Sequence, residues 1–204
     1  MVTGAVICFD SNNNEDMDTR RQCNQRSDED RNQAGLGYVE KRLRKTNVNP
    51  TVSTDEYYTP RWIIDTLGPF DCDPCAPPTD VRPFNIAPIS WTKEDDGLSK
   101  EWRGTVWMNP PYSRLLLRQF CERMAQHGNG IAILVNRQDN LLWQEVVFPT
   151  AASMIFMRHR VKFLRPDGTS GTPFFGSCLV AWGHDCDRRL RWSGIEGKYV
   201  VLNL

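Results

Sequence analysis

The sequence contains no hydrophobic run long enough to cross a lipid bilayer, which takes about 18 consecutive apolar residues. The apolar stretch near the start, in MVTGAVICFD, is short, and no basic residues precede it. It therefore does not fit a secretory signal peptide. We expect a soluble, cytoplasmic protein with no membrane partner.

Net charge is also absent, because 25 lysine and arginine residues balance 25 aspartate and glutamate residues. The chain as a whole therefore produces no strong field that would attract a polyanion. The charges are unevenly distributed, however: residues 51–112 hold 5 basic and 10 acidic residues, whereas residues 113–204 hold 12 and 7. This asymmetry favours contact between a polyanion and the C-terminal part, although a solvated surface would give the same count.

The seven cysteines lack the pattern of a disulfide framework, since their number is odd and their spacing irregular. Cys72 and Cys75 form one C-x-x-C pair, but a structural zinc ion needs two further ligands at suitable spacing. The remaining Cys and His residues provide none. A redox pair is disfavoured because Cys72 is expected inside a strand. We predict no metal site.

Large apolar side chains are scarce over residues 10–55, where Asn, Asp, Arg, Gln and Ser predominate. Such a segment has too little apolar surface to bury for a stable core. We therefore expect residues 1–54 to form a polar, disordered N-terminal segment with at most one marginal helix. Residues 55–204 are expected to form one folded domain.

Turn and capping signals divide this domain into helices and strands. Thr59 is expected to cap a helix with Pro60 at its first position and Gly68 at its end. Ser113 and Gly128 bound a second predicted helix, and 141–148 is a third helical segment. Strands are predicted over 70–73, 86–91, 105–109, 130–136 and 154–157.

The order of these elements indicates the fold class. The apolar run 130–136 is typical of a strand covered on both faces. Extended runs over 161–164 and 174–182 flank a turn at 166–168 and predict a hairpin. Alternating strands and helices predict an α/β domain with a mostly parallel sheet, to which a C-terminal hairpin adds an antiparallel edge.

The segment TVWMNPPYS (105–113) leads from a hydrophobic strand into two consecutive prolines. Ligands of parallel α/β sheets bind at the carboxyl ends of strands, which is where Asn109 is expected. A purine amine is a poor nucleophile because its lone pair is delocalised into the ring. Hydrogen-bond acceptors for both of its N–H groups, the Asn109 side-chain oxygen and a proline carbonyl, would localise that lone pair.

The other residues of this segment fit the same chemistry. Pro110 and Pro111 make the acceptors rigid, and Tyr112 offers a flat face for an extruded base. The alternative is a tight strand-to-helix turn, in which Asn109 satisfies loop amides and Tyr112 packs in the core.

Asn109–Tyr112 resembles motif IV, (D/N/S)PP(Y/F/W), of S-adenosylmethionine-dependent amino methyltransferases. The order and spacing of DEYYTPRWIIDTLGPFDCDPCAP, WTKEDDGLSKEWRGTVWMNPPYS, HRVKFL and PFFGSCLVAW are similar to the phage-type DNA N-6-adenine methyltransferase (Dam) family, roughly over residues 55–182. The resemblance implies a Rossmann-like methyltransferase fold. It also implies methyl transfer from S-adenosylmethionine to the N6 amine of adenine in double-stranded DNA, with catalytic residues Asn109, Pro110, Pro111 and Tyr112.

The resemblance allows alternative interpretations. Glutamine and RNA methyltransferases share NPPY, and a nucleic-acid-binding module without cofactor is a non-enzymatic alternative. The family suggests GATC as the target, a bacteriophage or restriction-modification setting, and the host cytoplasm as location. No obligate protein partner is inferred.

The resemblance places the cofactor beside the first strand, where FDCDPCAP stands. There, carboxylates can accept hydrogen bonds from the ammonium or ribose hydroxyls, although a solvated strand end is the alternative. No G-x-G follows Asp71 and Asp73, whereas the general methyltransferase pattern has one after the acid. In similar enzymes a later acid binds the cofactor's adenine, and Asp96 is preferred to Asp95 here. The implied cofactor residues are Tyr58, Thr59, Pro60, Asp71, Asp73, Pro74, Asp95 and Asp96.

DNA contacts are expected in the C-terminal part, because the interval between the cofactor loop and NPPY is too short for a recognition domain. Basic residues at 158, 160 and 162 would share one face of a strand. A charged, solvated edge strand would explain them equally well. The predicted DNA-binding residues are Arg137, Arg158, Arg160, Lys162 and Arg165.

Overall fold

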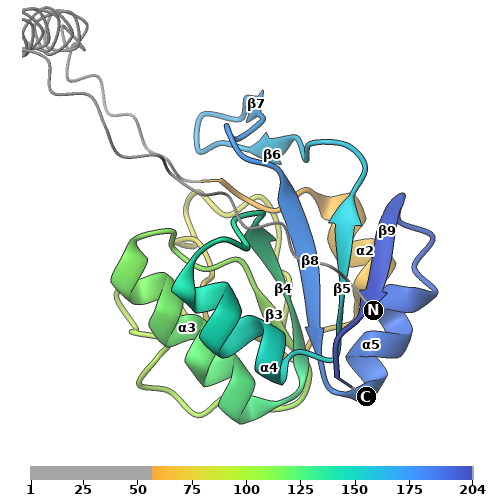
Figure 1. Ribbon diagram of the computed structural model, residues 1–204. Coiled ribbons are helices and arrows are strands. Elements are labelled where there is room, and N and C mark those ends of the chain that lie inside the picture. The colour runs from red at the N-terminus through yellow and green to blue at the C-terminus, as the bar shows by residue number, and fades with distance from the viewer. Residues whose placement is uncertain (1–56, 204) are drawn as a thin grey trace, which may run out of the picture. The chain divides into compact units, whose positions relative to one another are not determined.

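The computed structural model describes residues 57–203, so the expectation for residues 1–54 lies outside the described residues (Figure 1). A seven-stranded sheet with the order β2-β1-β3-β4-β8-β5-β9 forms the centre of the described part. Its strands are β1 (Cys72–Asp73), β2 (Ile89–Ser90), β3 (Val106–Met108), β4 (Gly130–Val135), β5 (Ser153–Met157), β8 (Ser177–Trp182) and β9 (Gly197–Val201). Strands β6 (Phe163–Leu164) and β7 (Ser170–Gly171) form a separate hairpin.

Five of the seven strands run in the same direction, and β8 and β9 run in the opposite one. Strands β2, β1, β3 and β4 pair in parallel, and β5 runs in the same direction because both β4 and β5 are antiparallel to β8. Strand β9 pairs antiparallel to β5 at the edge. The predicted α/β class and mostly parallel sheet are therefore confirmed.

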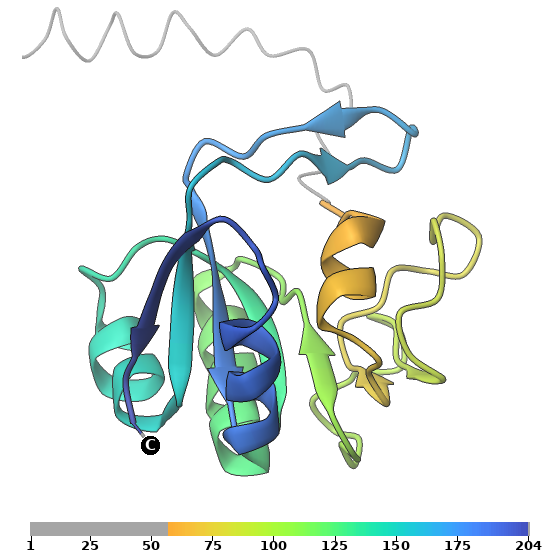
Figure 2. The ribbon, with the colours of Figure 1, turned by 90° about the vertical axis from the view of Figure 1, so that its right-hand side faces the viewer.

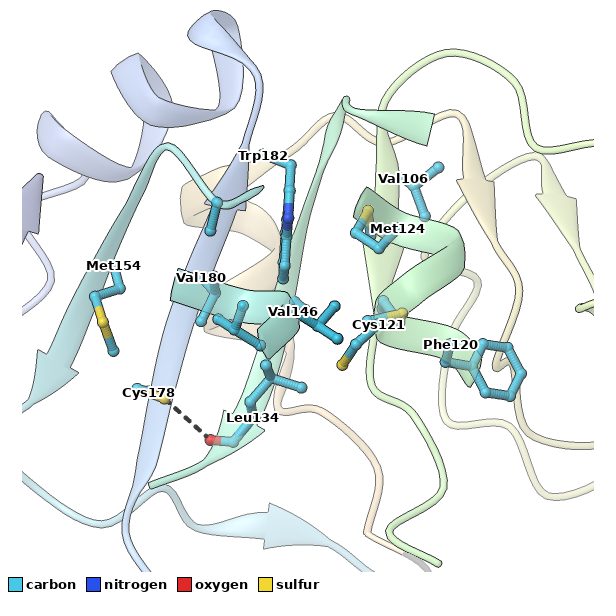
Figure 3. Close-up of a cluster of buried hydrophobic side chains, with 14 of the residues drawn as sticks. Val106, Phe120, Cys121, Met124, Leu134, Val146, Met154, Cys178, Val180 and Trp182 are labelled. Atoms are coloured by element: carbon cyan, nitrogen blue, oxygen red, sulfur yellow. Dashed lines mark hydrogen bonds between the residues drawn. The ribbon is translucent and has the colours of Figure 1, made fainter. Parts of the chain in front are cut away.

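Helices cover both faces of the sheet. On one face lie α3 (Arg114–His127), the π-helical turn η1 (Trp143–Val147) and α4 (Phe148–Thr150), and on the other lie α2 (Arg61–Leu67) and α5 (His184–Arg191). Side chains alternate between the layers, as strand geometry requires: Val106 and Met108 pack toward α3, whereas Trp107 packs toward α2. Figure 3 shows the α3 side, where the Cys178 thiol donates to the carbonyl of Leu134.

Local signals predicted several boundaries well. Ser113 and Gly128 flank α3, and Gly128 adopts the left-handed conformation at its C-cap. The first helix differs: α2 begins at Arg61, so Pro60 is its N-cap and the Thr59 side chain makes no capping bond. The main chain is extended up to Pro60 because Tyr58 exchanges two backbone hydrogen bonds with Leu164, at 2.8 and 2.9 Å. The prediction of a Thr59 cap was wrong by one residue.

An antiparallel hairpin is present, but its partners differ from the prediction. The turn after Leu164 closes tightly, with Arg165 donating its N–H to Thr169, so β6 pairs with β7 and not with 174–182. The latter run is β8, which lies between β4 and β5 and is buried along its whole length. An apolar strand of this kind suits the interior of a sheet. Strand β9 and helix α5 were not predicted.

The segment 158–162 is irregular and not a strand, so the predicted common strand face for Arg158, Arg160 and Lys162 is wrong. The chain leaves the sheet after β5 to reach the hairpin, which lies above α2 in Figure 2. Within residues 57–203, no helix is both long and apolar enough to span a membrane.

Candidate active site

The carboxyl ends of β1, β3 and β4 meet at one edge of the sheet, the upper edge in Figure 1. Cys72 pairs with Val106, so Pro74 follows β1 at the level where Met108 ends β3. Asn109 and the two prolines leave the sheet beside this loop. The structure therefore brings FDCDPCAP and NPPY together, as the strand order requires.

Asn109 has a fixed amide orientation. Its Nδ2 donates to the main-chain carbonyl of Tyr57 at 2.7 Å, so its Oδ1 is left as an acceptor. The Tyr112 hydroxyl lies 3.4 Å from this Oδ1. Pro110 is buried, and its carbonyl accepts no hydrogen bond from residues 57–203. Two neighbouring acceptors with free capacity thus stand at the end of β3.

Tyr112 combines an anchored, buried hydroxyl with partial exposure of the residue as a whole. Its hydroxyl donates to the carbonyl of Ile133 in β4 at 3.1 Å, and burial of this group raises its pKa above the ordinary value of 10. The residue as a whole remains 40% exposed. The side chain is thus tied to the sheet at its polar end, while the residue as a whole is partly exposed to solvent.

Asp73 ends β1 and is almost fully buried, with 3% of its surface exposed. Its Oδ1 accepts the N–H of Cys75 at 3.0 Å. Burial raises the pKa of this carboxyl from 3.8 to about 7, and the positive charge of Arg82 counteracts the rise only partly. Hydrogen-bond donors or a positive charge on a ligand bound at this edge would keep the Asp73 carboxyl ionised.

We expect Asp73→Asn to become more stable relative to the wild type as the pH rises. The folded-state pKa lies above the unfolded one, so the contribution of Asp73 to stability is present below about pH 4 and is lost as the pH rises through about 7. Asparagine does not titrate and can still accept the Cys75 N–H. The difference in unfolding free energy between variant and wild type should grow by a few kcal/mol, in order of magnitude, between pH 4 and pH 8. Urea unfolding at both pH values measures it, and an unchanged difference would contradict the raised pKa.

Asp71 lies apart from these residues. Its Oδ2 accepts the N–H of Thr105 at 2.7 Å and packs against Gly104, at the amino end of β3. It is therefore engaged at the edge of the sheet opposite to Asn109. The structure brings Asp73 and Pro74 to the carboxyl edge and does not bring Asp71 there.

The turn that contains Asp95 and Asp96 packs closely against the loop after β1. A Cβ on Gly97 would lie 2.1 Å from the carbonyl oxygen of Pro74, so only glycine allows this contact. The Gly97 carbonyl also accepts the indole N–H of the buried Trp102 at 2.8 Å. Gly97 thus fixes the position of both acids relative to the first strand.

The two acids differ in availability. The Asp95 carboxylate accepts the N–H and hydroxyl of Thr92, both at 2.9 Å, and these bonds lower its pKa. Asp96 has a left-handed backbone, φ 54°, and its exposed carboxylate has no partner among residues 57–203. Asp96 is therefore the freer of the two to bind a ligand.

The segment Tyr58-Thr59-Pro60 is buried beside this edge. The Tyr57 carbonyl that holds Asn109 precedes it directly. The Thr59 hydroxyl is buried and finds no hydrogen-bond partner within the described part of the chain. Buried polar atoms are nearly always satisfied, so a ligand at this position would supply the missing bond.

The predicted DNA-binding residues are all exposed, and most have weak local partners. Arg158 lies 3.6 Å from Glu196, and the Arg160 guanidinium donates to the carbonyl of Pro173 at 2.9 Å. Arg137 follows β4 and stacks over Phe175, and Arg165 lies over the ring of Tyr57. Lys162 makes no ion pair in the described residues.

Cys72 and Cys75 flank Asp73 and Pro74 in the FDCDPCAP segment. Burial raises the pKa of Cys72 to about 12 and that of Cys75 well above its ordinary value, so both thiols stay protonated. In the part of the chain that the structure describes, no three His, Cys, Asp or Glu residues are grouped to hold a metal ion.

Two features of this site were not predicted from the sequence. The Tyr57 carbonyl, which orients Asn109, lies 52 residues earlier in the chain. Gly97 had a visible signal, a glycine directly after two acids, but its contact with Pro74 depends on tertiary packing.

Comparison with known proteins identifies the family of this chain. Residues 45–182 match the family described as DNA N-6-adenine-methyltransferase (Dam), which is about two thirds of the chain. A relative from Escherichia phage T1, the DNA N-6-adenine-methyltransferase, is 28% identical over 125 residues, or 57% of this chain. The chain spans 50% of the length of that relative, and no solved structure matches significantly. Because the family match includes both β1 with its loop and NPPY and covers more than half of the chain, the protein belongs to the DNA N-6-adenine-methyltransferase (Dam) family.

Proposed function

We propose that this protein is an S-adenosylmethionine-dependent methyltransferase with a Rossmann-like fold, acting on the N6 amine of adenine in double-stranded DNA. The observation that carries the proposal is the arrangement of Asn109 and Pro110. The Tyr57 carbonyl holds the Asn109 amide so that Oδ1 is an acceptor, and the neighbouring Pro110 carbonyl has free capacity.

These two acceptors suit a primary aromatic amine. Each can accept one N–H of the amine, which reduces the conjugation of the nitrogen lone pair with the ring and makes the nitrogen more nucleophilic. The proline φ is locked, so the acceptors need little reorganisation during the reaction. The bond between Tyr112 and Ile133 holds the aromatic ring close to the place where the base would lie.

The residues around β1 fit the proposed cofactor. S-adenosylmethionine, when bound, supplies a methyl group on a positively charged sulfur. Asp73 would accept a hydrogen bond from its ammonium or hydroxyls, and Asp96 one from its adenine amine. The unsatisfied Thr59 hydroxyl and the buried Asp73 carboxyl are both groups that gain a partner from such a ligand. The exposed Arg137, Arg158, Arg160, Lys162 and Arg165 would contact DNA phosphates.

A transfer assay tests the proposal. The full chain is incubated with methyl-labelled S-adenosylmethionine and, in parallel, unmethylated duplex DNA, RNA or protein, and the DNA product is digested and analysed for N6-methyladenine. Label in N6-methyladenine is expected. Label in RNA or in protein glutamine instead would show that the substrate belongs to one of those classes. If calorimetric titration detects no binding of S-adenosylmethionine, the protein is a non-catalytic nucleic-acid-binding module. Sequencing the methylated DNA decides whether the target is GATC.

The ring and the hydroxyl of Tyr112 should contribute differently. Tyr112→Phe loses the bond to Ile133 but keeps the ring, so we expect transfer within about threefold of wild type and a stability loss of about 1 kcal/mol. Tyr112→Ala loses the stacking surface and should reduce transfer about tenfold or more. Steady-state rates on the same duplex measure both, and equal rates for the two variants would rule out stacking by this ring.

A further inference from the structure

The loop Thr172–Gly176, between β7 and β8, holds two aromatic side chains that the core does not use. Phe174 is 82% exposed and Phe175 42% exposed. Their rings pack against each other edge to face, with centroids 5.1 Å apart. Neither residue belongs to the buried clusters on the two faces of the sheet.

The loop is fixed at both ends, so these rings are displayed on a defined support. The Pro173 carbonyl accepts the Arg160 guanidinium at 2.9 Å, and the Gly176 carbonyl accepts the N–H of Asn136 at 2.8 Å. The Arg137 guanidinium lies 5.1 Å from the centre of the Phe175 ring. An aromatic pair that is anchored in this way keeps its apolar surface in solvent until a partner covers it.

The loop lies on the same edge of the sheet as Asn109. Figure 1 shows β7 and the start of β8 at this upper edge. Strand β4 lies between β3 and β8, and Gly176 is level with Asn136, a few residues beyond the end of β3. Two strand spacings and this rise place Gly176, at the end of the loop, roughly 10–15 Å from Asn109. A nucleotide swung out of a duplex spans a distance of this order.

The charge around the loop favours a polyanion as the partner. Residues 158–176 contain four Arg or Lys residues and a single acid, Asp167. That carboxylate is engaged by the N–H and hydroxyl of Thr169 within the hairpin turn. Two acids outside this segment also lie near its cations: Glu196 is 3.6 Å from Arg158, and Asp139 is 3.5 Å from Arg137. Arg160, Lys162 and Arg165 form no salt bridge with an acid within the described residues. Flat apolar rings with cations around them match the stacked bases and phosphates of nucleic acid.

From this placement we infer that Phe174, supported by Phe175, inserts into duplex DNA and fills the gap left by the extruded adenine. The inference rests on the proposed function. An extruded base leaves the faces of its neighbours unstacked, and an aromatic wedge replaces part of the lost stacking. Asn109 and Tyr112 would receive the base, while Phe174 would keep the duplex open behind it.

The experiment compares Phe174→Ala and Phe174→Trp with the wild-type full chain. The rate of labelled methyl transfer is measured on a duplex that contains a site mapped in wild-type product. Phe174→Ala should lose about tenfold or more, the size of one aromatic stack, while Phe174→Trp should retain most of the rate. On the same duplex with an abasic site opposite the target adenine, extrusion needs no unpairing, and the defect should shrink to about threefold or less. Trp192→Ala, an equally prominent aromatic at 78% exposure beyond α5, serves as control and should leave the rate unchanged.

The outcomes separate this inference from the proposed function. If wild type transfers no methyl group to DNA, both fail. If wild type is active and Phe174→Ala is equally active, or if its defect persists in full on the abasic duplex, the wedge is overturned and the function stands. A dimer in size-exclusion chromatography that Phe174→Ala disrupts would show that a second copy of the chain covers these rings, which also overturns the inference.

Discussion

Asn109→Ala is expected to reduce methyl transfer to DNA by about 100-fold or more, the loss seen when one preorganised polar group is removed from a reacting centre. The variant removes the Oδ1 acceptor and also releases the Tyr57 carbonyl, which Nδ2 holds at 2.7 Å. Cofactor affinity should change much less, because two backbone hydrogen bonds to Leu164 still hold Tyr58, and the other residues proposed to bind the cofactor belong to other segments. Labelled transfer under saturating DNA, together with calorimetric titration of S-adenosylmethionine, measures the two quantities.

Two further variants sharpen this prediction. Asn109→Asp keeps an oxygen acceptor but loses the donor to Tyr57, so its rate should lie between those of wild type and Asn109→Ala. Asn129→Ala is a matched control, since Asn129 also donates to a main-chain carbonyl, that of Gly104, at the opposite edge of the sheet. It should transfer within about threefold of wild type, as expected for a change outside the site. An Asn109→Ala enzyme that is as active as this control would exclude Asn109 from catalysis.

Gly97→Ala is expected to weaken the binding of S-adenosylmethionine at least tenfold, because a Cβ at this position would lie 2.1 Å from the Pro74 carbonyl oxygen. The Pro74 oxygen is a main-chain atom and a Cβ is rigidly attached to the main chain, so the turn with Asp95 and Asp96 must move away from β1. Overpacking of this kind costs about 1–3 kcal/mol of stability. Calorimetric titration and urea unfolding measure the two effects separately.

Gly176→Ala provides the comparison for this variant. A Cβ there would find its nearest neighbour at 3.9 Å, and the residue has no positive φ. We expect both cofactor affinity and stability close to those of wild type. Gly97→Ala protein that is destabilised but binds the cofactor normally would show that the contact with Pro74 serves folding alone.

Features that depend on neighbours in the chain were predictable from the sequence. The residues that bound α3, Ser113 and Gly128, the apolar strand β4 and the strand that ends before Asn109 were all found where local signals placed them, although the Ser113 side chain makes no capping hydrogen bond. The family was also recognised from motif order, which the match over residues 45–182 confirms. The strand pairing was not predictable, because β8 pairs with β4 and β5 according to which apolar faces fit together across the sheet.

The sequence by itself determined the chemistry available to the protein: an amide, two prolines and a phenol after one strand, and acids after another. Tertiary structure alone decided which of these groups are available to bind a ligand. Asp71 and Asp73 look equivalent in FDCDPCAP, but strand register commits Asp71 to Thr105 and buries Asp73 at the carboxyl edge. The orientation of Asn109 likewise depends on a carbonyl 52 residues away. The reason is physical: the type of a side chain is local, whereas its hydrogen-bond partners and solvation are set by segments that only folding brings together.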